Sequence, residues 1–119
     1  MNCPFCENDS IIDGTLVYVR YDKYPVSKGH CLIVPKRHVE TWFKMTKEKQ
    51  VEAFELIEKV KTMLDEKYAP DGYNIGMNCG ETAGQTIPHA HIHLMPRYQG
   101  DMQSPRGGVR GVIPGKQSY

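Results

Sequence analysis

Residues His89 to Leu94 place three histidines at every second position, with small or apolar residues between them. Such strict alternation predicts a β-strand with one apolar face, because successive side chains of a strand point to opposite sides. Residues on the same face lie roughly 6.5–7 Å apart, so the rings of His89, His91 and His93 would stand in a row. The ordinary alternative is a solvated strand face. We favour a catalytic or ligand-binding site, because histidine is an uncommon residue and three of them are clustered here.

The size and charge of the chain limit what it can bind. Its 119 residues suit one domain with a single core. Fifteen Lys and Arg against fourteen Asp and Glu leave a net charge of +1, which is no electrostatic signature for nucleic acid or an anionic membrane. The sequence contains neither an apolar run of membrane-spanning length nor the pattern of a signal peptide. We therefore expect a cytoplasmic protein that binds neither nucleic acid nor membranes.

Cys3 and Cys6 form a Cys-x-x-Cys motif. Two thiolates at this spacing can converge on one tetrahedral metal ion. A redox motif is the alternative, but it usually lies between a strand and a helix, whereas this one runs into the polar residues 7–10. In a reducing compartment both interpretations are favoured over disulfides, and we expect Cys31 and Cys79 to be small apolar residues.

The predicted secondary structure is one long helix among short strands. Thr46 has the residue type of an N-cap, and apolar residues recur at helical spacing from Val51 to Leu64, so we expect a helix over about 46–68. Composition and alternation predict strands over 15–21, 30–35, 73–78 and 89–94, the second of them buried on both faces. The residues after 97 are rich in glycine and proline and should form an irregular extension.

Two segments, Gly84–Arg97 and Gly29–His38, resemble the recurring segments of the histidine-triad (HIT) family. The first reads Gly-Gln-Thr-Ile-Pro-His-Ala-His-Ile-His-Leu-Met-Pro-Arg, and the resemblance covers about residues 3–97. Its His-x-His-x-His-x-x-Pro-Arg form is similar to the dinucleoside-polyphosphate hydrolase branch. The Trp-Pro-Pro-Gly ending of the nucleoside phosphoramidase branch is missing.

The resemblance implies a fold and an assembly. We expect an α+β, HIT-like fold with an antiparallel sheet of about five strands, one long helix and a C-terminal irregular extension. Residues 1–97 would form the HIT domain with an N-terminal zinc knuckle, and residues 98–119 would form the extension. Two copies are expected to pair as a homodimer.

The resemblance also implies a reaction. A ring nitrogen of His91 would attack the α-phosphorus of a dinucleoside polyphosphate or nucleotide conjugate, forming a nucleotidyl-histidine that water then opens. Imidazole suits this role because its ordinary pKa near 6.5 leaves it largely neutral at pH 7, and His93 would donate to the phosphate oxygens. The alternatives are a nucleotide-binding sensor or interaction protein with slow incidental turnover, and a nucleoside phosphoramidase.

Further residues match family positions one at a time. Asp22 matches a residue that accepts from the ribose hydroxyls, and Asn78 matches an amide residue near the phosphates. Backbone N–H groups near Gln85 and Thr86 are suited to phosphate oxygens, and His30 is either a support for the site or a buried histidine of the core. The expected nucleotide-binding set is Asp22, His30, Asn78, Gln85, Thr86 and His93.

Three neighbouring histidines could themselves be taken for a catalytic metal site. The resemblance to zinc-bearing relatives implies a different arrangement, in which the metal ligands are Cys3, Cys6, His38 and His89. This Cys₂His₂ set would hold a closed, structural zinc and leave His91 free as the nucleophile.

Residues 97–119, the extension together with Arg97, carry four cationic residues against one acidic residue. We expect their arginines, among them Arg97, to reach the polyphosphate of the substrate, because guanidinium groups bind phosphate oxygens in pairs. A solvated tail is the ordinary alternative. A third possibility is an arm that packs on its own chain or on a partner through Val109, Val112 and Ile113.

Overall fold

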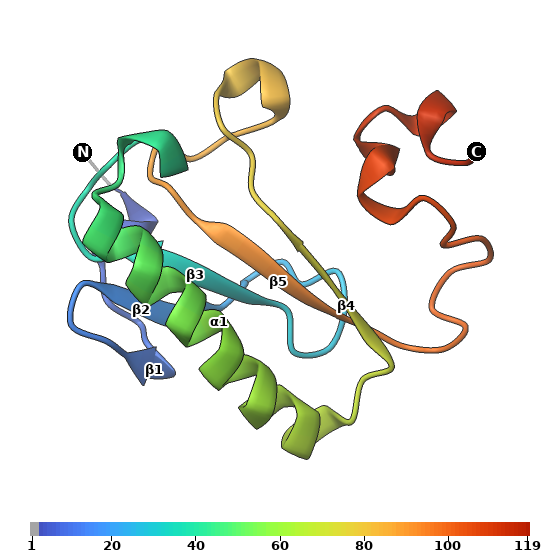
Figure 1. Cartoon of the computed structure of the whole chain (residues 1–119), viewed down its shortest axis with the longest axis horizontal. Coiled ribbons are helices and arrows are strands. Elements are labelled where there is room, and N and C mark those ends of the chain that lie inside the picture. The colour runs from blue at the N-terminus through green and yellow to red at the C-terminus, as the bar shows by residue number, and fades with distance from the viewer. Residues whose placement is uncertain (1–2) are drawn as a thin grey trace.

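The computed structural model describes residues 3–119, so Met1 and Asn2, which the predicted first domain includes, lie outside the described residues. Within that range, one antiparallel sheet of five strands and one long helix confirm the predicted α+β architecture. The strands lie in the order β1-β2-β3-β5-β4, and helix α1 crosses one face of the sheet (Figure 1). The elements are β1 Ile12–Asp13, β2 Val17–Tyr21, β3 Cys31–Pro35, α1 Lys47–Tyr68, β4 Gly72–Gly76 and β5 Ile92–Arg97.

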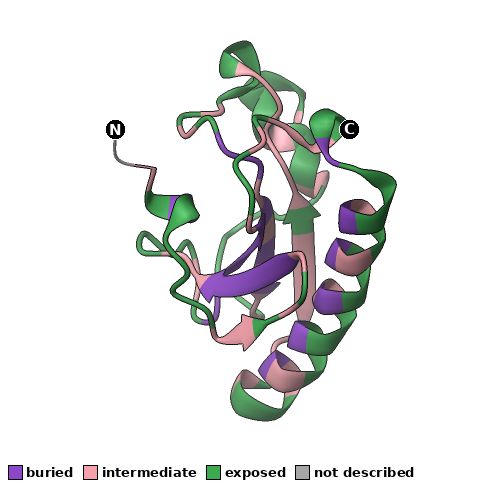
Figure 2. Ribbon diagram, turned by 90° about the vertical axis from the view of Figure 1, so that its left-hand side faces the viewer, coloured by how far each residue is buried: buried purple, intermediate pink, exposed green. Residues whose placement is uncertain are grey.

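Helix α1 begins and ends close to the predicted positions. The Thr46 side chain accepts a hydrogen bond from the Lys49 amide, as expected of an N-cap. The helix ends where Ala69 adopts a left-handed conformation (φ 48°), directly before Pro70. The face toward the sheet is buried (Figure 2) and consists of Ala53, Leu56, Val60 and Leu64.

The central strand β3 is buried along its whole length, as predicted. Its Cys31 and Ile33 side chains pack in the core under α1, while Leu32 and Val34 face the opposite side. On that side they cluster with Phe5 and with Tyr18 of β2. The segment that carries Phe5 therefore packs on the face of the sheet opposite α1.

The boundaries of the strands differ from the prediction, and most of them differ by one or two residues. The largest difference is in β5, which begins at Ile92 instead of His89. The Ala90 N–H donates to the Val39 carbonyl at 2.7 Å, outside the sheet, so residues 89–91 are not part of the ladder. The predicted row of three histidines on one strand is therefore wrong. Strand β1 was not predicted, since two residues carry no alternation.

The extension turns back beside β4 and contains two short 3-10 helices, Gly108–Val112 and Pro114–Lys116 (Figure 1). Outside these two short turns the extension is irregular, as predicted. Among residues 3–119, no helix has the length and apolarity that a bilayer crossing requires.

Candidate functional site

Four predicted metal ligands from three separate parts of the chain come together. Cys3 precedes and Cys6 ends a single 3-10 turn, His38 follows β3, and His89 precedes β5. Their donor atoms all lie within 4.8 Å of one another. The Nδ1 atom of His89 lies 3.3 Å from the Cys3 sulfur and 3.5 Å from the Cys6 sulfur. Around a tetrahedral zinc with ordinary bond lengths, sulfur and nitrogen ligands are separated by about 3.6 Å.

His89 presents its ring to the cluster in the tautomer that a metal requires. The Nε2–H of His89 donates to the Pro35 carbonyl at 2.8 Å, which leaves Nδ1 with a lone pair facing the thiols. A hydrogen bond with Cys3 raises the pKa of the Cys6 thiol, and a divalent cation would reverse this effect by binding thiolates. Two soft thiolates and two imidazoles are a ligand set that suits zinc, so the residues fit the predicted metal.

A cavity of about 560 Å³ lies beside the metal cluster, on the face of the sheet away from α1. The strand register places Leu32 of β3 between Arg20 of β2 and His93 of β5, and all three line the cavity. Its volume is typical of a small-molecule site. The predicted site residues that line it are Asp22, His30, Asn78, Thr86, His91 and His93.

The hydrogen bonds of His91 determine which ring nitrogen is reactive. Its Nδ1 lies 2.8 Å from the carbonyl oxygen of His89, which can only accept, so Nδ1 carries the proton. Nε2 therefore holds the lone pair. Burial lowers the pKa of His91 further below its usual value, so the ring is neutral at pH 7. The arrangement provides a neutral, nucleophilic nitrogen beside a cavity.

A second chain of hydrogen bonds determines the proton position on His93. The Val26 N–H donates to His30 Nδ1 at 3.1 Å, so the proton of neutral His30 is on Nε2. That Nε2–H donates to His93 Nδ1 at 2.9 Å, which leaves His93 with a proton on its own Nε2. His93 is therefore a donor beside the lone pair of His91, and the two ring centroids are 5.2 Å apart.

A second group of possible metal ligands lies at the cavity and consists of Asp22, His30 and His93. Their donor atoms lie within 4.8 Å of one another, so a metal between them is an alternative to hydrogen bonding. A metal there would need the lone pair of His30 Nε2. The proton would then have to move to Nδ1, where it would face the Val26 N–H. The cluster is thus built as a hydrogen-bond relay, with the Asp22 carboxylate 3.4 Å from His30 Nε2.

Gln85 differs from the other predicted nucleotide-binding residues in its placement. Its side chain accepts from the Gly80 N–H and donates to the Glu40 and Ile87 carbonyls, and its own N–H donates to the Gly80 carbonyl. It does not line the cavity. Gln85 therefore braces the loop, which turns through positive φ at Gly80 and Gly84.

Several residues at the cavity were not singled out in the sequence. They include Phe5, which lies between the two cysteines of the knuckle, and Val26, which acts through its backbone N–H. Phe5 was detectable only through its position inside the Cys-x-x-Cys motif. A backbone donor such as that of Val26 leaves no signal in a sequence.

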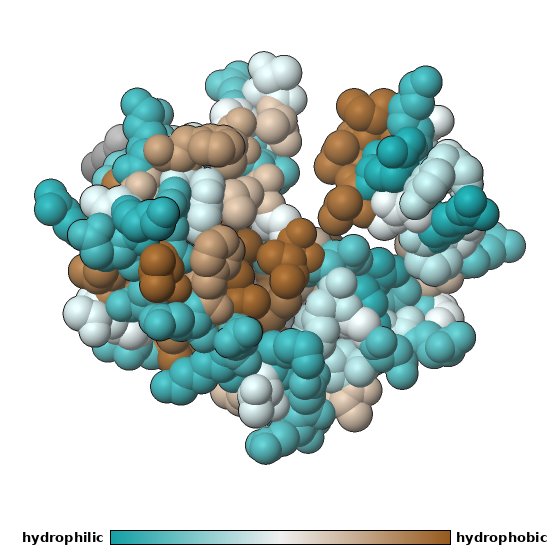
Figure 3. Space-filling model, viewed as in Figure 1, coloured by the Kyte–Doolittle hydropathy of each residue, from teal (hydrophilic) through white to brown (hydrophobic). Residues whose placement is uncertain are grey.

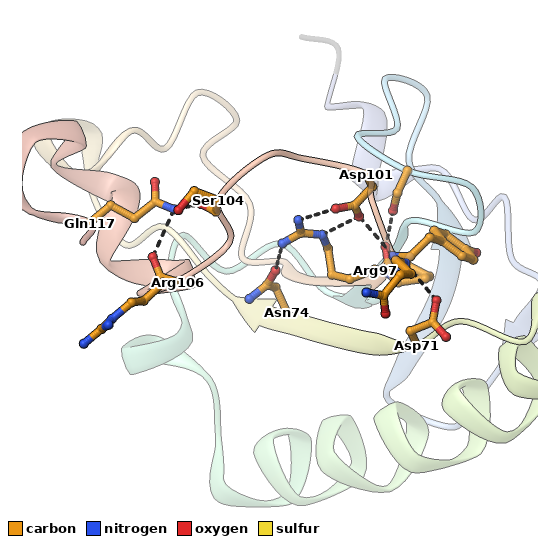
Figure 4. A network of polar contacts seen from close by, with 11 residues as sticks. Asp71, Asn74, Arg97, Asp101, Ser104, Arg106 and Gln117 are labelled. Carbon is orange, nitrogen blue, oxygen red and sulfur yellow. Dashed lines mark hydrogen bonds and ion pairs between the residues drawn. The ribbon is translucent and has the colours of Figure 1, made fainter. Parts of the chain in front are cut away.

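The extension does not contribute to the cavity in its own chain, since none of the described residues 98–119 lines it. Figure 4 shows that Arg97 is already occupied: its guanidinium binds the Asp101 carboxylate through two bonds of 2.7 Å and donates a third to Asn74. The expectation that Arg97 is available for polyphosphate is therefore wrong for this conformation. Its role is to hold the start of the extension against β4.

The two proton positions can be measured. We expect neutral His91 to carry its proton on Nδ1 and neutral His93 on Nε2. Burial first, and then the neighbouring His91 and His30, lower the pKa of His93 from 6.5 to about 4. The unfolded chain then binds more protons than the folded one between these two values, so His93 lowers the free energy of unfolding as the pH falls through that window.

Long-range ¹H–¹⁵N spectra recorded between pH 7.5 and 4 report both the tautomer and the titration of each ring. A His93 ring that is protonated near pH 6.5, or that carries its proton on Nδ1, would contradict the relay.

A sequence profile of the HIT domain matches residues 6–100. The AP-4-A phosphorylase of Mycobacterium tuberculosis is 34% identical over 107 residues, which cover 82% of this chain and 55% of that protein. The bis(5'-nucleosyl)-tetraphosphatase [asymmetrical] of Schizosaccharomyces pombe is 34% identical over 77 residues, which cover 65% of this chain and 42% of that protein. The chain thus spans about half the length of these two relatives.

Solved structures show the same fold. A HIT family protein from Bacillus anthracis has a TM-score of 0.78 at 33% identity, covering 87% of this chain and 79% of that one. A zinc-bound histidine triad family protein from Mycobacterium smegmatis has a TM-score of 0.76 at 28% identity, covering 86% of this chain and 79% of that one.

Proposed function

This chain belongs to the HIT domain family, and we propose that it is a nucleotide hydrolase or transferase that cleaves at the α-phosphate of a dinucleoside polyphosphate or nucleotide conjugate. One observation carries the proposal. His91 and His93 line the same cavity, where His91 offers a lone pair on Nε2 and His93 offers an N–H donor on Nε2. Phosphoryl transfer depends mainly on positioning and on donors aimed at the phosphate oxygens. The names of the two enzyme relatives support this substrate class.

In the proposed first step, a bond forms between His91 Nε2 and the α-phosphorus. The bond from that phosphorus to the bridging oxygen breaks, and its electron pair leaves with the second nucleotide. Water then attacks the nucleotidyl-histidine, the phosphorus–nitrogen bond breaks, and a nucleoside monophosphate and a proton are released. The His93 Nε2–H stabilises the charge on the phosphate oxygens in both steps.

We assign further cavity residues to the ribose, the phosphates and the base of a bound nucleotide. Asp22, whose carboxylate already accepts from the Tyr24 N–H at 2.8 Å, is proposed to accept from the ribose hydroxyls. Asn78 and Thr86 lie in the wall of the same cavity and are proposed to contact the phosphates. The apolar wall made by Leu32 and Ile87 suits a base.

Zinc is proposed as the structural ion of the cluster formed by Cys3, Cys6, His38 and His89. The ligand distances, the tautomer of His89 and the zinc-bound relative support this assignment. A compartment that keeps thiols reduced, such as the cytoplasm, is part of the proposal, because the metal requires free thiolates. We also propose residues 1–97 as the catalytic domain and 98–119 as its extension.

A homodimer is proposed as the working assembly. Figure 3 shows apolar side chains on the body and on the extension, on either side of a hollow. Exposed apolar residues on the body include Val51, Phe54 and Ile75, and those on the extension include Val109, Val112 and Ile113. A second copy that covers both sets would remove them from water.

The homodimer is a testable prediction. Light scattering at micromolar concentration should give twice the mass of the 13.6 kDa chain. Replacing both Val112 and Ile113 with aspartate should shift the equilibrium toward the monomer, because it places charges in the apolar contact. Ser118→Asp, which adds a charge to the same extension without removing an apolar side chain, should stay dimeric. A monomeric wild-type protein would refute the assembly.

Two other functions compete with hydrolysis. A nucleoside phosphoramidase would use the same His91, and a nucleotide-binding sensor would bind without appreciable turnover. Incubating the protein separately with diadenosine tetraphosphate and adenosine phosphoramidate distinguishes the three. Faster cleavage of the tetraphosphate supports our proposal, faster cleavage of the phosphoramidate supports the second function, and binding without cleavage of either supports the third.

A further inference from the structure

The metal cluster and the cavity share one segment of the chain. Cys3 and Cys6 contribute the two thiols, while Pro4 and Phe5 between them line the cavity. The cluster therefore helps to position one wall of the cavity, in addition to fixing the segment from Cys3 to Cys6 against the sheet.

Phe5 makes direct contact with the proposed nucleophile. Its ring centroid lies 4.8 Å from that of His91, with the two planes tilted by 58°. The same ring meets His89 edge-on at 6.1 Å. Phe5 is 7% exposed, so it is packed between the metal cluster and the nucleophile.

His89 makes a second connection between the cluster and the nucleophile. Its side-chain Nδ1 faces the thiols, while its carbonyl oxygen holds the Nδ1–H of His91 at 2.8 Å. A shift of residue 89 toward or away from the metal would therefore move the acceptor that sets the tautomer of His91.

Other contacts hold part of the segment independently of a metal. The Tyr18 hydroxyl donates to the Phe5 carbonyl at 2.8 Å, and the buried Arg20 donates to the Pro4 carbonyl at 2.9 Å. These bonds hold the middle of the turn. The two cysteines at its ends are connected to the rest of the chain mainly through His38 and His89. The effect of the metal on the cavity should thus be graded, not all-or-none.

We propose that metal binding at the Cys3–Cys6 turn and nucleotide binding in the cavity are positively coupled, with Phe5 as the positioning residue that transmits the coupling. The inference rests on the proposed nucleotide-binding function of the cavity. A bound metal orders the turn, so a nucleotide that contacts this wall no longer has to order it. Coupling between binding sites is reciprocal, so the nucleotide must raise the affinity for the metal by the same factor.

The test uses the full chain, zinc and AMP, and it measures binding instead of turnover. Calorimetry should show AMP binding about tenfold more weakly to chelator-treated protein than to zinc-loaded protein, within the usual range of coupling between two sites. Competition with a chelator should show that saturating AMP tightens zinc binding by the same factor. If the metal-free protein unfolds, any ligand of the folded state tightens zinc binding, so circular dichroism must first show that the chelator-treated chain is folded; otherwise the comparison with the Phe5 variants below carries the test.

Variants of Phe5 test whether this residue transmits the coupling between the metal and the nucleotide. Phe5→Ala should still bind zinc but lose most of the effect of AMP on zinc affinity, and Phe5→Tyr should restore it. Phe43→Ala, which removes a ring that is 78% exposed, serves as the matched control and should keep the wild-type coupling. If AMP leaves the zinc affinity of wild-type protein unchanged, the coupling is refuted. Unchanged coupling in Phe5→Ala would refute the role of Phe5, whereas failure of AMP to bind loaded protein would refute the proposed function instead.

Discussion

His91→Ala is expected to reduce turnover of a dinucleoside polyphosphate by about 10⁴-fold or more, because it removes the atom that forms the covalent bond. The fold should be retained, since the side chain lies beside a cavity and is only partly buried. AMP should still bind, because the other cavity residues are unchanged. Single-turnover kinetics with alkaline quenching, which preserves the acid-labile phosphorus–nitrogen bond, should detect the nucleotidyl-histidine in wild-type protein and none in the variant.

A substitution of the neighbouring His93 distinguishes loss of phosphate stabilisation from loss of the nucleophile. His93→Ala removes the Nε2–H donor of the imidazole and should cost about 10²–10³-fold in turnover, as for a single lost oxyanion donor, while the covalent intermediate still forms. Near-normal rates in His91→Ala would rule out the covalent mechanism.

Removal of the metal is expected to have the largest effect on stability. Purified protein should carry one zinc per chain, and Cys3→Ser or Cys6→Ser should lose it. We expect the free energy of unfolding to fall by about 3 kcal/mol, since metal-binding free energy contributes directly to folding. For a chain of this size that corresponds to a drop of roughly 10 °C in Tm.

Elemental analysis and calorimetric melting test this expectation. Cys79→Ser is the control, because Cys79 is a free thiol outside the cluster and its loss should change neither the zinc content nor the Tm. A protein that is purified without metal and melts at the same temperature with or without chelator would exclude the site.

Patterns that depend on near neighbours in the chain were sufficient to predict much of the fold. Thr46 as an N-cap, and apolar residues at helical spacing, predicted α1 nearly to the residue. The apolar run of β3 predicted a strand buried on both faces, because only such a position excludes polar residues throughout. The nucleophile and the metal cluster were nominated by the resemblance of Gly84–Arg97 and Gly29–His38 to the HIT family, because the residue types alone left other sites open.

The same local reasoning failed at residues 89–94, where the alternating pattern is compatible with two backbone conformations. The alternation of residues 89–94 predicts one continuous strand, yet the bond between Ala90 N–H and the Val39 carbonyl takes residue 89 out of the sheet. His89 thereby reaches the metal cluster, while His91 and His93 remain at the cavity. The partner that decides this lies about fifty residues earlier in the chain, and alternation carries no information about it.

The sequence by itself thus determined the chemical groups, the helix and most of the strands, because these follow from residue types and from neighbours a few positions apart. Tertiary structure alone decided the proton positions and the neighbours of each group. The Val26 N–H sets the tautomer of His30, and Phe5 is brought against His91 from the far end of the chain. Both depend on backbone groups and long-range contacts, which arise only when distant segments pack together.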